Sequence, residues 1–208
     1  LLSDGVSFRF HHMMKECTQR AFVMLSHEKQ TNFQNRYGQW YESRGQFLQA
    51  LSAYNKALNY DAALAVIQKD AGILLASLSP EKVLTFLDAC PTEILKNRPL
   101  ALLVLMRRMF TWHQIPKMLE LKQLLTDIIA EDNTLSEDER KNLSGECDLI
   151  MSFLMYNDIT GMSVLHRQAS SKMTRPAISI RNTGSWTFGS PSVLMMFHRE
   201  PGLLSTEL

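Results

Sequence analysis

The sequence predicts an all-α protein, a superhelix of stacked antiparallel helical hairpins. Apolar residues recur at helical spacing from Phe33 onward, and turn or capping signals separate these stretches. An aromatic-x-x-Ala helix start occurs twice, at Phe47 to Ala50 and at Tyr60 to Ala63. Short helices of this kind cannot bury their apolar faces alone, so we expect each to stack on its predecessor.

The stretch from Phe33 to Lys69 carries most of this prediction. Small residues stand where two helices would cross, and large ones where the groove between helices would receive them. Gln34 and Ala62 depart from the pattern, which favours Trp and Pro there. The spacing is that of a degenerate tetratricopeptide hairpin, so we expect a tetratricopeptide-like α-α superhelix. The agreeing residues are Gly38, Tyr41, Gly45, Phe47, Ala50, Tyr54 and Ala57.

Periodicity and capping signals divide the rest of the chain into elements. Residues Val6 to Leu25 predict one strand, without a partner, that leads into one helix. The helix from Pro99 is apolar on nearly all sides and should be central. The expected helices are Thr31 to Ser43, Phe47 to Leu58, Asp61 to Leu75, a short helix from Pro80 to Cys90, Pro99 to Trp112, Ile115 to Glu131, Ser136 to Leu154, Asp158 to about Met173, and one beginning at Ser190.

Composition limits the classes of partner. The 208 residues carry 22 Lys and Arg against 21 Asp and Glu, and a net charge of +1 predicts no overall attraction to nucleic acid or anionic lipid. The longest apolar run, Leu100 to Met106, is far shorter than the roughly 20 residues that span a bilayer. Three scattered cysteines indicate reduced thiols and a cytoplasmic location, with no membrane partner. Since Leu1 is not a methionine, we expect a piece of a longer protein.

Two segments carry a resemblance to a known family. Phe8-Arg9-Phe10-His11 before an apolar helix resembles the end of a winged-helix module, and Gly184 to Pro191, with the run from Leu194 to Gly202, resembles part of a sensor arm. The family is that of LuxR-type transcriptional activators built like the maltose-regulon activator, which are signal-transducing ATPases.

That resemblance implies a domain division and a function. Residues 1–30 would be the end of a winged-helix-like module with a connecting helix, and residues 31–208 a helical sensor region that continues beyond residue 208. The sensor would bind a small-molecule inducer or a regulatory protein and would contact other domains of the parent. ATP and DNA would bind only to domains absent here, because the chain has neither a phosphate-binding glycine-lysine motif nor a terminal helix-turn-helix.

The residues offer little enzymatic chemistry. The six histidines form no i,i+4 pair around a carboxylate, and no Cys-x-x-Cys occurs, so we expect neither a metal nor a cofactor in this chain. Cys147 and His166 are one conceivable nucleophile and base. The position of Cys147 on an apolar stripe favours a core thiol instead, and we expect no enzyme.

The candidate effector or partner site is Arg175, Arg181, Trp186 and Phe188. From Arg167 to Arg199 the chain has five basic residues and no Asp or Glu, and the two aromatic residues lie between Gly184 and Gly189. Aromatic faces and paired arginine donors suit an anionic or polyhydroxylated ligand. Alternatively, the aromatic rings fill a gap between helical hairpins and the arginines are solvated or cap helix ends.

Two functions remain open at this level. The first is the inducer-sensing region of a bacterial regulator, and the second is a tetratricopeptide-like adaptor that binds a partner protein without a small-molecule effector. Helical scaffolds host unrelated ligands, so the inducer itself cannot be read from the sequence.

Trp186→Ala separates the two interpretations of the loop from Arg181 to Pro191. If the loop is a site, binding of inducer or partner weakens while thermal stability stays nearly unchanged. If the loop fills a packing gap, the same change lowers stability by roughly 3 to 5 kcal/mol. Thermal unfolding and ligand titration on this one variant measure both quantities, and a large stability loss with intact affinity removes Trp186 from the site.

Overall fold

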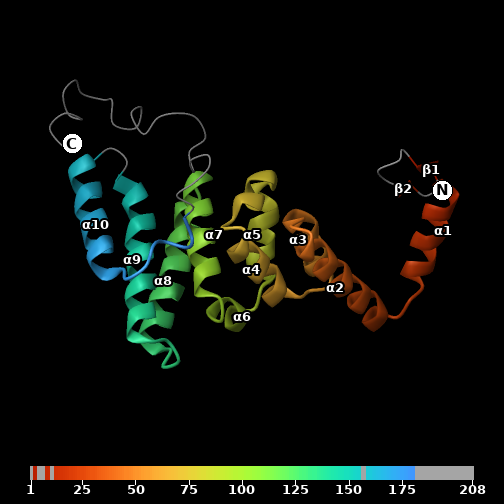
Figure 1. The fold of residues 1–208 in the computed structure, drawn as a ribbon, viewed down its shortest axis with the longest axis horizontal. Coiled ribbons are helices and arrows are strands. Elements are labelled where there is room, and N and C mark those ends of the chain that lie inside the picture. Colours follow the sequence, from red (N-terminus) through yellow and green to blue (C-terminus); the bar gives the residue numbers. More distant parts are fainter. Residues whose placement is uncertain (1, 4–7, 10–11, 156–157, 181–208) are drawn as a thin grey trace, which may run out of the picture. The chain divides into compact units, whose positions relative to one another are not determined.

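The structure, a computed structural model, describes residues 2–3, 8–9, 12–155 and 158–180 (Figure 1). The predicted all-α class is confirmed: ten α-helices and two short 3-10 helices account for nearly all of the regular structure in these ranges. The chain divides into two compact units, between Ala63 and Leu64. The predicted boundary at residue 30 concerns family modules and stays a prediction. The predicted helix at Ser190 lies outside the described residues.

The first unit begins with a pair of short strands. Strand β1 (Leu2–Ser3) pairs antiparallel with β2 (Phe8–Arg9), which precedes helix α1 (His12–Val23). The expectation of a strand without a partner was therefore wrong. Two residues are too few to show an alternating pattern, so β1 gave no sequence signal.

Helices α2 (His27–Ser43) and α3 (Phe47–Lys56) pack closely against each other. Gly38 permits this approach, because a Cβ atom there would lie 2.3 Å from the ring of Tyr54. The Tyr54 hydroxyl donates a hydrogen bond to Glu42 Oε2 at 2.8 Å, and the Tyr54 side chain is only 2% exposed. The glycine and the tyrosine thus meet at the helix crossing, as the sequence pattern predicts.

Two boundaries in this region differ from prediction. Helix α2 begins four residues earlier than expected, because the hydroxyl of Ser26 caps it by accepting from the Lys29 backbone N–H. Helix α4 (Tyr60–Lys69) ends earlier than Leu75. Ala71 and Gly72 adopt left-handed backbone angles there, and a 3-10 helix, η1 (Ile73–Ser77), follows.

The second unit is built around helix α7 (Pro99–Thr111), green in Figure 1. Eight of its residues are buried, so the prediction of a central helix is confirmed. It packs against α8 (Ile115–Glu131) and α9 (Glu137–Met151). The predicted capping box is present, since Ser136 Oγ accepts from the Glu139 backbone N–H at 3.2 Å. The other elements are α5 (Pro80–Ala89), α6 (Thr92–Lys96), which was not predicted, η2 (Ser152–Met155) and α10 (Ile159–Lys172).

Ala50→Leu tests the hairpin packing. Ala50 is fully buried in α3, so added methylenes must displace their neighbours, and we expect a loss of about 1 to 3 kcal/mol in the free energy of unfolding. Urea denaturation measures it. Ser52→Leu, at an exposed position of the same helix, is the matched control and should change stability by less than about 0.5 kcal/mol. Equal effects of the two substitutions would contradict the assigned crossing.

Candidate functional site

One side of α2 presents aromatic and basic side chains to solvent. With 3.6 residues per turn, six exposed residues fall within an arc of about 100°. The opposite side carries Gly38 and Glu42 and faces α3. We name this surface the α2 face; its residues are Lys29, Phe33, Arg36, Tyr37, Trp40 and Arg44.

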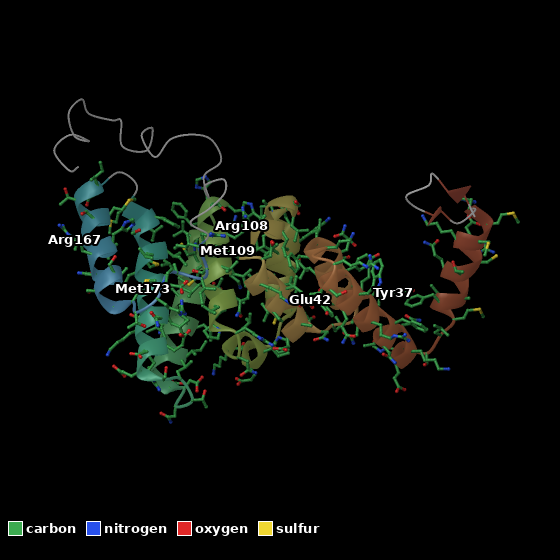
Figure 2. All side chains as sticks on the ribbon, viewed as in Figure 1. Tyr37, Glu42, Arg108, Met109, Arg167 and Met173 are labelled. Carbon is green, nitrogen blue, oxygen red and sulfur yellow. The ribbon has the colours of Figure 1, made fainter. Side chains whose placement is uncertain are left out.

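The aromatic rings of the α2 face are unusually accessible. Phe33, Tyr37 and Trp40 are 39%, 51% and 49% exposed, and Tyr37 is labelled on its helix in Figure 2. The guanidinium carbon of Arg44 lies 4.4 Å from the centre of the Trp40 ring, a cation-π arrangement. Tyr41 meets the same ring edge-on, with centroids 5.0 Å apart. Trp40 is therefore held in place while half of its surface stays open.

The basic side chains of the α2 face have no acidic partner. Within the described part of the chain, no carboxylate forms an ion pair with Lys29, Arg36 or Arg44. Glu42, on the same helix, points to the other side and accepts from Tyr54. The face is thus positively charged and free to receive an anionic group.

A pocket opens at the N-terminal half of this face. Its volume is about 430 Å³, and two cations, one amide and two apolar side chains line it. Apolar walls with a few convergent polar groups are typical of ligand-binding pockets. The lining residues are Leu25, Lys29, Asn32, Phe33 and Arg36.

A second cleft, of about 310 Å³, lies among α5, α6 and α8. Its cation, Lys117, pairs with Asp88 at 2.9 Å and with Glu120 at 3.1 Å. The hydrogen bond that Lys117 donates to Asp88, together with the one that it donates to Glu120, raises the pKa of Lys117. Because the charge of Lys117 is already neutralised, this cleft attracts an anion less strongly than the α2 face does.

Of the four residues predicted as a site, the structure describes Arg175. Its guanidinium donates to Glu146 Oε1 at 2.5 Å and to Glu139 Oε1 at 2.9 Å, both on α9. Burial alone would lower the pKa of Arg175, but these hydrogen bonds outweigh it and raise the pKa. Arg181, Trp186 and Phe188 lie outside the described residues, and the four-residue site stays a prediction.

Arg175 belongs to a polar network that fastens residues 173–180, the strap, onto α9. Glu146 is fully buried and also accepts from the backbone N–H and the hydroxyl of Ser179, at 2.9 and 2.6 Å. Asn142 Oδ1 accepts from the Thr174 backbone N–H at 2.8 Å. A Cβ atom at Gly145 would lie 2.4 Å from Met173 Cγ, so only glycine allows this approach.

The residues considered for nucleophilic chemistry are placed for packing. Cys147 is 7% exposed, and burial, with the nearby charge of Asp148, raises the pKa of its thiol to about 11. His166 Nε2 lies 2.9 Å from the hydroxyl of Ser152, which is fully buried and donates its own proton to Leu149 O. His166 is thus hydrogen-bonded to Ser152, and burial lowers the pKa of its imidazole.

The searched part of the chain holds no group of three or more His, Cys, Asp or Glu that could bind a metal ion. Among the same residues, no helix is long and apolar enough to cross a membrane.

No known protein family, curated protein or solved structure matches this chain. The chain can therefore be described only by its fold and by its exposed surface. It is an all-helical protein that exposes an aromatic and basic helix face in its first unit. The sequence carried a signal for this face, since aromatic and basic residues recur at intervals of three, four and seven. The face was not among the predicted sites, because only the packing residues of α2 were used to predict this helix.

Glu146→Ala tests the strap. Removing this fully buried carboxylate leaves Ser179 without its acceptor and Arg175 with one partner fewer, so we expect a loss of about 3 kcal/mol in the free energy of unfolding. Denaturant titration measures it. Glu139→Ala removes the other, more exposed partner of Arg175 and should cost at most about 1 kcal/mol. Similar losses for both variants would contradict a network centred on Glu146.

Proposed function

We propose that this chain is the sensor and interaction region of a bacterial LuxR-type transcriptional regulator. In this proposal it binds an inducer or a regulatory protein in the cytoplasm and controls ATP-dependent DNA binding by other domains of the parent. The observation that carries the proposal is the α2 face. Three exposed aromatic rings, and three cations that have no acidic ion-pair partner among the described residues, stand on one side of a helix whose other side is packed. Exposed aromatic and arginine side chains are enriched among residues that dominate binding.

The helical packing supports a tetratricopeptide-like arrangement. Gly38 meets Tyr54, and Ala50 and Ala57 are buried, at the positions where that repeat needs small residues. Repeats of this kind present one helix of each hairpin as a binding surface. In this proposal α2 is such a helix.

The beginning of the chain supports the family. An antiparallel strand pair, β1 with β2, leads directly into helix α1. A strand hairpin next to a helix is what the end of a winged-helix module would supply, and residues 1–30 take that role in the proposal.

The same α2 face also favours a second candidate, an adaptor that binds a partner protein without any small-molecule effector. An exposed helix face with aromatic anchors suits a peptide as well as an inducer. The two candidates differ in the parent protein: only the regulator requires an ATP-binding domain and a DNA-binding domain in the same chain.

Trp40→Ala in the full-length parent tests the proposal. Losing a central aromatic anchor should reduce activation of a promoter reporter by about tenfold, with protein abundance and ATP binding retained. Leu119→Ala is the matched control, since it truncates an exposed apolar side chain of α8, a helix of the second unit. If the parent encodes neither an ATP-binding motif nor a helix-turn-helix, or if both variants activate normally, the regulator proposal fails.

A further inference from the structure

The α2 face has a repeat of its own. Lys29 and Arg36 are seven residues apart, and so are Phe33 and Trp40. At 1.5 Å per residue, like side chains recur about every 10.5 Å along the helix. Cations and rings therefore alternate in one stripe. In a second helix that lies alongside α2, residues seven positions apart face α2. The spacing of those residues therefore matches the spacing of the side chains in this stripe.

The positive charge of the stripe indicates which charged groups a binding partner would carry. Its cations, all of them exposed, have no acidic ion-pair partner among the described residues. The guanidinium carbon of Arg44 lies 4.4 Å from the centre of the Trp40 ring, and a guanidinium stacked on a ring can still donate hydrogen bonds to an acceptor. Carboxylates are the protein groups that match a guanidinium in charge and geometry.

The exposed rings and the pocket indicate which apolar groups a binding partner would carry. Phe33, Tyr37 and Trp40 leave about half of their surface or somewhat less exposed, which is costly unless a partner covers it. The pocket of about 430 Å³ lies beside Phe33, between Lys29 and Arg36. It can receive a large apolar side chain whose neighbours are acidic.

The spacing of the cations argues against nucleic acid. From Lys29 to Arg44 a single row of three cations extends over about 22 Å. Duplex DNA carries one negative charge per roughly 1.7 Å over such a length, so three cations would neutralise only a small part of it. One acidic residue every two helical turns matches the row much better.

We propose that the α2 face binds an acidic amphipathic helix of a partner protein, in which carboxylates alternate with large apolar residues and recur every seven or eight residues. The carboxylates pair with Lys29, Arg36 and Arg44, and the apolar side chains cover Phe33, Tyr37 and Trp40. This inference rests on the proposed function, and it assigns the interaction to a regulatory protein instead of a small inducer.

A charge-swap titration with the complete 208-residue chain tests this assignment. The probe is a fluorescein-labelled helical peptide about four heptads long, with Glu and Leu alternating on its binding side. The second probe has Lys in place of every Glu. Fluorescence anisotropy gives Kd for each peptide, at low salt and at high salt.

Two double variants with equal change in charge are compared with the unaltered chain. Arg36→Glu with Arg44→Glu reverses the sign of two charges on the α2 face. Lys15→Glu with Lys56→Glu reverses the sign of two exposed charges elsewhere in the same unit. We expect the first variant to bind the Glu peptide at least about tenfold more weakly and to bind the Lys peptide instead. The second variant should bind as the unaltered chain does.

Several outcomes would overturn the inference. The first is that the unaltered chain does not bind the Glu peptide. The second is that both double variants weaken binding of the Glu peptide equally. The third is that single-stranded RNA displaces the Glu peptide at a lower concentration than unlabelled peptide does. Binding to the isolated chain but not to the full-length parent would also overturn it, because another domain of the parent would then cover the face.

The two proposals fail separately. If the Glu peptide does not bind but Trp40→Ala still reduces promoter activation about tenfold, only the acidic-helix inference fails. If the charge swap works but the parent lacks the ATP-binding and DNA-binding motifs, only the regulator proposal fails.

Discussion

The burial of α7 is the constraint on which the second unit depends. Eight of its residues are shielded from water, and one of them is the cation Arg107. Because a buried guanidinium must find an acceptor, Arg107 donates to Ala71 O at 2.5 Å, and Arg108 donates to Gly72 O at 3.2 Å. Burial, with the charge of Arg108, lowers the pKa of Arg107 to about 10, which still leaves it charged at neutral pH. The arginines thus satisfy the carbonyl groups freed where α4 ends and the chain turns left-handed.

In the first unit a single close approach decides which side of α2 faces solvent. Gly38 lets the Tyr54 ring pack directly on the helix backbone, and Glu42 fixes the tyrosine hydroxyl. Once these residues face α3, the residues half a turn away must point outward. The aromatic rings of the α2 face are therefore exposed as a result of the crossing geometry. Arg44 then holds Trp40 in a defined orientation. Trp40 therefore loses less conformational entropy when a partner binds.

The strap on α9 shows a different use of polar groups. Glu146 is fully buried, yet Arg175 and Ser179 supply it with a counter-charge and two further donors. Such a network is stable only when every member is satisfied, and no buried polar side-chain atom of the described residues lacks a partner. The network holds the chain against α9 as far as Ser179. Part of the arginine-rich segment is thus engaged with acidic residues of a distant helix.

The sequence by itself determined the helical class, most helix boundaries and the glycine and alanine positions of the α2–α3 hairpin, because periodicity, caps and residue size are local properties. It placed α8 and the start of α9 correctly for this reason. Only the tertiary structure decided that Arg175 meets Glu139 and Glu146, since partners some 30 residues apart leave no local pattern. It also decided that the side of α2 rich in aromatic residues faces water. A helical pattern shows which residues share a side, but the packing of the neighbouring helix selects the side that is buried.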